Sequence, residues 1–161
     1  MRRRKSFTLL ELIIAMAIIS IVLAGVFMAF SVALRLFVGE LTRSNVYIEA
    51  DRGMNKITKD LKSSREIVSG TSREVSFWLF DFNGNGTREA DETATFLWSG
   101  SPESSLNRIL SSETIPIAYG VNNFTLTYDD PLSPKLITVK IMIGKGLNTV
   151  TLESSVKLRN I

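Results

Sequence analysis

RRRKSFTLLE (residues 2–11) sets four consecutive positive charges against the start of an apolar run. The run continues through residues 12–34 without a charged side chain, and only Ser20 and Ser31 carry hydroxyl groups. At ~1.5 Å rise per residue, a helix of this length covers the ~30 Å hydrocarbon layer of a membrane. Cytoplasmic flanks of such helices carry the excess Lys and Arg, so we expect the N-terminus to stay inside and the residues after Arg35 to cross.

Glu11 is a carboxylate at the edge of this apolar run. A charge inside the membrane is costly unless it snorkels or finds a partner, which makes Glu11 a candidate functional residue. The alternative is that Glu11 lies at the headgroup level, about one turn inside the helix, where its charge favours the positive end of the helix dipole. The residues alone leave both interpretations open.

Ser6-Phe7-Thr8-Leu9-Leu10-Glu11, after a basic leader and before an apolar run, resembles the class III signal of type IV prepilins and type II secretion pseudopilins. The resemblance implies that a prepilin peptidase cuts between Ser6 and Phe7 and methylates the new N-terminus at Phe7. It also implies that Glu11 pairs with the N-terminal amine of a neighbouring subunit, which supplies a partner for its charge. The chain departs from the family at Ser6, where the family normally has Gly.

The composition excludes several classes of function. The chain has 19 Lys and Arg against 16 Asp and Glu, but without the four basic leader residues the balance is 15 against 16. The excess of basic residues therefore lies in the leader, where it sets the orientation of the helix in the membrane. We do not expect nucleic-acid binding. The chain has no Cys and no His, which excludes disulfides, Cys/His zinc sites and His-based catalytic triads. We therefore expect a protein that is not an enzyme.

Apolar residues recur at three- and four-residue steps beyond the membrane segment, with charged residues between them. This spacing predicts an amphipathic continuation of the same helix, with an apolar stripe that packs on another element. We expect the helix to end between Ser63 and Ser69, with Gly70 as its C-terminal cap.

The last ninety residues have the patterns of strands. Residues 74–80 and 93–98 flank a turn-rich segment and predict a hairpin, in which Trp78 and Trp98 either face each other in the core or form an exposed partner patch. Weaker strand signals lie at residues 108–110 and 115–117, where Pro116 favours an edge strand or no strand. Three further segments alternate apolar with polar residues, as in a sheet with one buried face: residues 121–128, 136–143 and 150–158.

These elements predict an α+β fold, in which a long N-terminal helix packs on an antiparallel β-sheet through the apolar stripe of its second half. Together with the resemblance, these elements lead us to expect a pilin-like fold. The expected parts are a cleaved basic leader (1–6), a transmembrane and filament-core helix (7–34), an amphipathic helix half (35–69) and an antiparallel β domain (70–161).

DFNGNGTREADE (residues 81–92) fits the twelve-residue calcium-loop pattern, with oxygen donors at loop positions 1, 3 and 5, Gly at 6 and Glu at 12. Calcium takes six to eight oxygen ligands, so water or Glu89 would complete the shell of a structural ion. The alternative is a metal-free connection, because Asn-Gly occurs twice and is a strong turn dipeptide between strands. The candidate ligands are Asp81, Asn83, Asn85, the Thr87 carbonyl and bidentate Glu92.

The end of the chain, SSVKLRN (residues 154–160), resembles the closing strand of the minor pseudopilin J and minor pilin W group. Asp60-Leu61 and residues 121–128 carry the same resemblance. It implies a low-copy subunit that joins other minor pseudopilins at a filament tip to start assembly. The implied partners are other minor and major pseudopilins or pilins, the prepilin peptidase, the inner-membrane assembly platform and, before assembly, membrane lipid.

Two functions remain open at this point. The first is a structural subunit, anchored in the bacterial inner membrane with a periplasmic domain and later built into a filament. The second is a binding or adhesive module displayed on a membrane or filament anchor, with residues 81–92 as a calcium-stabilised contact loop. Type II secretion, a type IV pilus and a competence pilus are all compatible with the sequence.

Overall fold

The computed structural model describes residues 8–130, 134–146 and 148–158. The chain divides into two units, Met1–Leu41 and Thr42–Ile161. One helix, α1 (Leu9–Ser63), contributes to both units. The second unit also contains a short 3₁₀ helix, η1 (Ala90–Glu92), and an antiparallel sheet. The predicted α+β class, a long N-terminal helix with an antiparallel sheet, is therefore confirmed.

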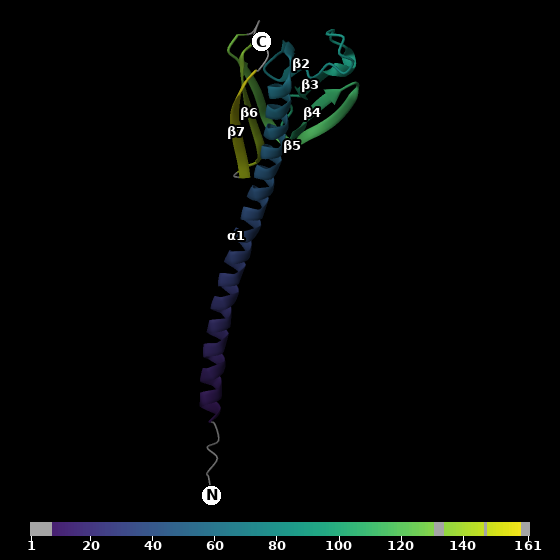
Figure 1. The fold of residues 1–161 in the computed structure, drawn as a ribbon. Coiled ribbons are helices and arrows are strands. Elements are labelled where there is room, and N and C mark those ends of the chain that lie inside the picture. The colour runs from purple at the N-terminus through teal and green to yellow at the C-terminus, as the bar shows by residue number, and fades with distance from the viewer. Residues whose placement is uncertain (1–7, 131–133, 147, 159–161) are drawn as a thin grey trace. The chain divides into compact units, whose positions relative to one another are not determined.

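Within the described residues the sheet has seven strands in sequence order, each antiparallel to the next (Figure 1). Such an order is a meander, which needs only short connections between neighbouring strands. The strands are β1 (Glu66–Gly70), β2 (Glu74–Trp78), β3 (Thr93–Trp98), β4 (Ser104–Leu110), β5 (Glu113–Tyr128), β6 (Leu136–Lys145) and β7 (Asn148–Lys157).

One face of the sheet is buried by the second half of α1. Gly53 lies so close to β5 that an added Cβ would be 2.9 Å from the Cβ of Ala118. The neighbouring strands alternate buried with partly exposed residues, as in β3, where Ala94, Phe96 and Trp98 are buried. This is the one-sided alternation that the sequence predicts. The helix buries Ala50, Gly53, Met54, Ile57, Asp60 and Leu61, which follow three- and four-residue steps.

The predicted hairpin of residues 74–98 is present, since β2 pairs with β3 from Glu74 opposite Leu97 to Trp78 opposite Thr93. The two tryptophans do not face each other, however. Trp98 pairs with Leu106 of β4 and is buried, whereas Trp78 lies at the other end of the β2–β3 pair and is only partly buried. The five-residue length of β2 places the two indoles at opposite ends of the hairpin.

The helix ends within the predicted range of Ser63 to Ser69, but its C-terminal cap differs from the prediction. α1 ends at Ser63, and the N–H and hydroxyl of Ser64 both donate to the Leu61 carbonyl. Gly70 does not cap the helix but lies in β1, opposite Val75. A Cβ at Gly70 would be 2.5 Å from the Tyr128 hydroxyl oxygen, so close packing against Tyr128 explains a Gly there.

Pro116 lies inside β5, opposite Asn107 of β4. The pairing of β5 with β6 begins only at Val121, so the half of β5 that contains Pro116 has one paired neighbour in the described sheet. A residue without an N–H is tolerated at such a locally unpaired edge. The prediction of an edge position therefore describes this half of β5, although it is part of a long strand.

Candidate functional sites: the N-terminal signal and the 81–92 loop

The predicted cleavage and methylation positions, Ser6 and Phe7, lie outside the described residues. The structure begins at Thr8, which stands directly before α1. Cleavage between Ser6 and Phe7 and methylation of Phe7 stay predictions.

Glu11 and Thr8 form a reciprocal pair at the start of α1. The Glu11 N–H donates to Thr8 Oγ1 at 3.3 Å, while the Thr8 N–H and hydroxyl donate to Glu11 Oε2 at 2.9 and 3.0 Å. This arrangement is a capping box, which satisfies N–H groups that have no acceptor inside the helix. In the single chain the Glu11 carboxylate is exposed and held at the helix end, and its pairing with a neighbouring subunit stays a prediction.

Residues 12–34 form an uninterrupted helical segment of the first unit. Its large apolar side chains are exposed, and its two hydroxyls are satisfied within the helix. Ser20 Oγ donates to the Met16 carbonyl and Ser31 Oγ to the Phe27 carbonyl, each at 2.8 Å. Such back-bonding leaves no hydroxyl proton unpaired in an apolar surrounding. Within the described residues, α1 is the one helix long and apolar enough to cross a membrane.

The 81–92 loop connects β2 to β3 and ends in η1. Gly84 and Gly86 have φ angles of 70° and 71°, in the left-handed region where Gly avoids the steric penalty of a Cβ. The two Asn-Gly pairs are thus used as turns, as the metal-free interpretation requires, and the same curvature is needed by a calcium loop.

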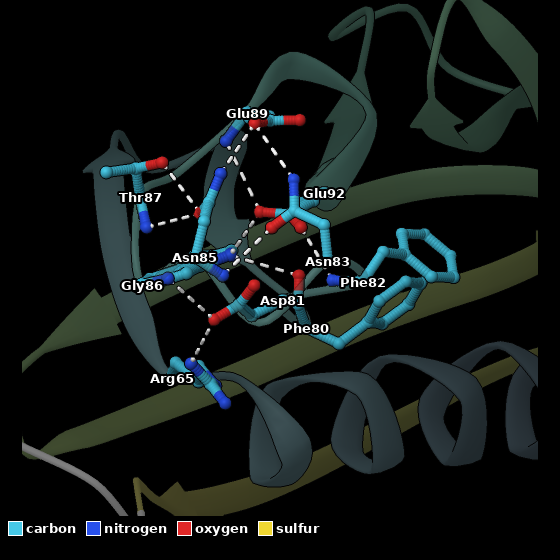
Figure 2. Close-up of polar contacts among 11 residues, drawn as sticks. Arg65, Phe80, Asp81, Phe82, Asn83, Asn85, Gly86, Thr87, Glu89 and Glu92 are labelled. Carbon is cyan, nitrogen blue, oxygen red and sulfur yellow. Dashed lines mark hydrogen bonds and ion pairs between the residues drawn. The ribbon is translucent and has the colours of Figure 1, made fainter.

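Glu92 is fully buried at the last position of the loop. Its Oε1 accepts a hydrogen bond from the Phe82 N–H at 2.6 Å. Its Oε2 accepts from Trp78 Nε1 at 3.2 Å and from the Glu89 N–H at 3.3 Å. Figure 2 shows the Glu92 carboxylate inside the loop, toward the side chains of Asn83 and Asn85. Glu92 therefore accepts two hydrogen bonds from within the loop, and the third, from Trp78, joins it to β2.

Asp81 is held through only one of its carboxylate oxygens. Oδ2 accepts from the Gly86 N–H at 3.1 Å and from Arg65 Nη1 at 3.2 Å. Oδ1 is buried and has no hydrogen-bond partner. Water cannot easily replace one, because the Asp81 side chain is only 4 % exposed. Buried carboxylate oxygens are nearly always hydrogen-bonded or bound to a cation, so Asp81 Oδ1 is an exception that needs an explanation.

The two asparagines shape the remainder of the loop. Asn83 Oδ1 accepts from the Asn85 N–H at 3.0 Å, and Asn85 Oδ1 accepts from the N–H and hydroxyl of Thr87, both at 2.7 Å. The side-chain amides of Asn83 and Asn85 both donate to Glu89 Oε1, at 3.0 and 2.9 Å. The structure thus brings the side chains of Asp81, Asn83, Asn85 and Glu92 into one loop, with Glu89 beside them (Figure 2).

Two contributors to this loop are absent from the sequence prediction. Arg65 precedes β1 and contacts both Asp81 and the Trp78 ring, whose centroid lies 5.1 Å from the guanidinium carbon. Trp78 donates its indole N–H to Glu92. Neither residue belongs to the twelve-residue pattern, and only the β1–β2 pairing places Arg65 beside Trp78. No local sequence signal identifies them.

The donor set is rich in oxygen but holds few charges. Among the described residues, no three Asp, Glu, Cys or His side chains form a group that could hold a metal ion. Any cation in the 81–92 loop would therefore need the Asn side-chain oxygens and backbone carbonyls in addition to Asp81 and Glu92.

Taken together, the structure is that of an α+β protein with a one-sided antiparallel sheet, and its apolar helix, which begins at the Thr8–Glu11 capping box, suggests membrane anchoring. Residues 1–27 match the family model described as the prokaryotic N-terminal methylation motif. This match supports a place in the type IV pilin and pseudopilin superfamily. A search of curated proteins and a search of solved structures each return no match to the chain.

Proposed function

We propose that the chain is a non-enzymatic minor subunit, a minor pseudopilin or minor pilin, of a type IV pilin-like filament. The main support is the methylation motif at residues 1–27, which includes the start of an apolar helix with exposed side chains. The particular role that we propose is assembly of the pseudopilus tip for type II secretion, on the periplasmic side of the inner membrane. The resemblance of residues 154–160 to the closing strand of the J group supports this finer assignment.

The exposed apolar surface suits a helix that exchanges one apolar environment for another. In the membrane, residues 12–34 contact lipid; in a filament, the same side chains contact neighbouring helices. Because lipid tails and apolar side chains are similar solvents for this surface, the transfer itself carries little hydrophobic penalty. A helix without charged side chains over residues 12–34 meets this requirement.

The membrane and the filament differ most in what they offer to the charge of Glu11. A carboxylate enclosed by apolar helices costs several kcal/mol unless an opposite charge pairs with it. The methylated N-terminal amine of Phe7 in a neighbouring subunit would provide that charge. In the single chain the Thr8–Glu11 capping box holds the carboxylate at the helix end. In a filament, the carboxylate would form an ion pair with this amine.

Substitution of Glu11 by Gln tests the proposal. Gln can keep the capping box, because it still offers a side-chain oxygen at this position, but it cannot pair as an anion. In cells that assemble a type II pseudopilus, we expect E11Q to be processed normally and to be recovered with sheared filaments at least ~10-fold less than the unsubstituted chain, as for the loss of a charge pair of ~1.4 kcal/mol or more.

Ser31→Ala provides the matched control, because it changes a helix position whose hydroxyl bonds only to the Phe27 carbonyl. The S31A chain should be recovered with filaments in wild-type amount. Recovery of E11Q at the wild-type level would contradict the proposed role of Glu11.

A displayed binding module is the alternative function, and one observation favours it. Phe82, in the 81–92 loop, is 68 % exposed and packs edge-on against Phe80 with ring centroids 4.0 Å apart. Phe80 is partly buried against the core, so Phe82 is the exposed ring of this pair, and aromatic residues of this kind are enriched in contact surfaces. Phe82→Ser would abolish partner binding by such a module while leaving filament incorporation unchanged, whereas E11Q would do the reverse.

A further inference from the structure

We propose that the 81–92 loop binds one calcium ion, with Asp81 Oδ1 as its central anionic ligand. Asn83, Asn85 and the Thr87 carbonyl would supply neutral oxygens, Glu92 a second carboxylate, and Glu89 or water the remaining position. The proposal goes beyond the filament function, because it concerns the folded β domain alone and does not depend on processing or assembly.

The free oxygen of Asp81 is the observation that points to a cation. It is buried, it has no hydrogen-bond donor, and it belongs to a carboxylate that is almost inaccessible to water. Figure 2 shows this oxygen pointing away from Arg65, toward the side of the loop on which Asn83 and Glu92 lie. A buried negative oxygen without a donor is strongly unfavourable, and a cation placed beside it removes the penalty.

The hydrogen bonds of Asp81 Oδ2 fix the orientation of Asp81 Oδ1. Gly86 N–H and Arg65 Nη1 both donate to Oδ2, so they fix the carboxylate plane. Arg65 balances part of the charge but leaves Oδ1 untouched. Groups that hold the non-coordinating oxygen of a ligand are the usual support around a metal site, because they orient the coordinating oxygen before the ion arrives.

The other carboxylate, Glu92, has limited capacity in the present arrangement. An ionised carboxylate has about four lone-pair sites, and Glu92 uses three of them for Phe82, Trp78 and Glu89. It can therefore offer one lone pair while all three hydrogen bonds hold. Bidentate binding requires one of the two Oε2 contacts, to Trp78 or Glu89, to lengthen.

Hydrogen bonds within the loop also use part of the lone pairs of the two asparagine side-chain oxygens. Asn83 Oδ1 accepts one hydrogen bond and keeps one lone pair, whereas Asn85 Oδ1 accepts two from Thr87. Rotation of the Thr87 hydroxyl frees the second lone pair of Asn85 without any movement of the backbone. The loop therefore needs only side-chain adjustments, since Gly84 and Gly86 already give it its curvature.

The donor chemistry selects the ion. All candidate ligands are oxygens and the chain has no Cys or His, which favours a hard cation over zinc or copper. Calcium accepts irregular shells of six to eight oxygens, whereas magnesium demands a smaller octahedral one. Among the candidate ligands only Asp81, Glu92 and Glu89 are charged. We therefore expect a calcium affinity typical of extracellular calcium modules, with a Kd on the order of 10⁻⁴ to 10⁻³ M.

Trp78 provides a built-in reporter, because its indole N–H donates directly to Glu92. The experiment uses the full chain in detergent, stripped with EGTA and titrated with CaCl₂ or MgCl₂ while tryptophan fluorescence and the thermal midpoint are recorded. We expect a saturable calcium-dependent fluorescence change and a rise in the midpoint, with at least ~10-fold weaker response to magnesium. No saturable response to calcium up to about ten times the expected Kd, or an equal response to magnesium, overturns the proposal.

Three substitutions make the test specific. Asp81→Asn should weaken calcium binding by ~10-fold or more, because it removes the central charge. The control Asp91→Asn changes an exposed neighbour outside the pattern positions and should bind as the unsubstituted chain does. Asn85→Asp should strengthen binding by several fold, since it adds a charged ligand at loop position 5. An unfolded variant cannot produce that gain, so unchanged or weaker binding by N85D overturns the assignment of ligands.

Discussion

Asp60 and Arg108 form a buried ion pair between α1 and β4. Arg108 Nε donates to Asp60 Oδ2 at 2.8 Å, and Lys56 Nζ contacts Asp60 Oδ1 at 3.0 Å. Removal of one partner from a buried pair leaves a charge without compensation, whereas replacement of both partners by apolar residues is often neutral. We therefore expect the pair to add little net stability, although the loss of either partner alone is costly.

We expect Arg108→Met to lower the free energy of unfolding by about 3 kcal/mol, at the lower end for a broken buried pair because Lys56 still contacts Asp60. The double variant Asp60→Leu with Arg108→Met should recover all but about 1 kcal/mol. Urea unfolding of the full chain in detergent, followed by tryptophan fluorescence, measures both.

The control for this prediction is Lys140→Met, which breaks the exposed pair of Lys140 and Glu153 at 3.7 Å. Such a surface pair contributes less than about 1 kcal/mol. A double variant no more stable than R108M alone would show that the charges themselves hold α1 on the sheet, contrary to this account.

Tyr128 links the end of β5 to the β1–β2 turn. Its hydroxyl donates to the Thr71 carbonyl at 3.1 Å, with the Glu74 carbonyl at 3.4 Å as the other acceptor. Burial, and secondly the charge of Glu74, raise the pKa of Tyr128 to about 12. The neutral phenol is therefore favoured by folding, and its contribution is complete below the unfolded pKa of about 10.

As pH rises from about 10 to 12, this contribution should be lost, because the unfolded chain releases the proton first. Tyr128→Phe should cost about 1 kcal/mol at neutral pH through the lost hydrogen bond and should show a smaller alkaline loss of stability than the parent. Urea midpoints at pH 8, 10 and 11 measure the effect. The exposed Tyr119→Phe is the control, and equal alkaline losses in Y128F and the parent would refute the assignment.

At the scale of the element, α1 uses glycines in two different ways. Gly53 lies against Ala118, so an added Cβ is 2.9 Å from the Ala118 Cβ, whereas a Cβ at Gly39 meets nothing within 4 Å. The same substitution should therefore have opposite effects in one helix. Ala is favoured over Gly by about 1 kcal/mol in helix interiors, but an overpacked core loses about 1–3 kcal/mol.

We expect Gly53→Ala to lower the urea midpoint of the β domain and Gly39→Ala to leave it unchanged or slightly raised. Addition of Ala118→Gly to the G53A chain removes the facing methyl and should restore part of the loss. Equal midpoints for G53A and G39A would mean that the contact of α1 with β5 is looser than 2.9 Å implies.

The elements differ in how well the sequence predicts them. The apolar run of residues 12–34 and the alternation in β3 and β6 follow from local pattern, because burial of one face imposes it directly. β1 escaped prediction because its five residues show no alternation, being exposed or partly exposed throughout. Its pairing with β2, together with the contact of Gly70 with Tyr128, shapes it.

The candidate site was partly predictable for the same reason. The spacing of oxygen donors in residues 81–92 is a local pattern and could be identified from the sequence. The unpartnered Asp81 Oδ1, and the support from Arg65 and Trp78, depend on how β1 and β2 pair. Only the folded chain places these residues together.

At the scale of the whole molecule, the two units have different kinds of surface. Within the described residues, every buried apolar side chain belongs to the Thr42–Ile161 unit. The described large apolar side chains of the Met1–Leu41 unit, from Leu9 onward, are exposed and need lipid or neighbouring helices to cover them. A domain with its own core, joined to a helix that needs an external apolar environment, is what a membrane-anchored filament subunit requires.

Whether this chain is a prepilin-like subunit can be measured by its intact mass after expression with and without a prepilin peptidase. We expect the peptidase to remove residues 1–6 and to add one methyl group at Phe7, and we expect Ser6→Gly to be processed at least as completely. If the chain keeps its full mass in cells where the same peptidase processes a control prepilin, it is not a prepilin-like subunit.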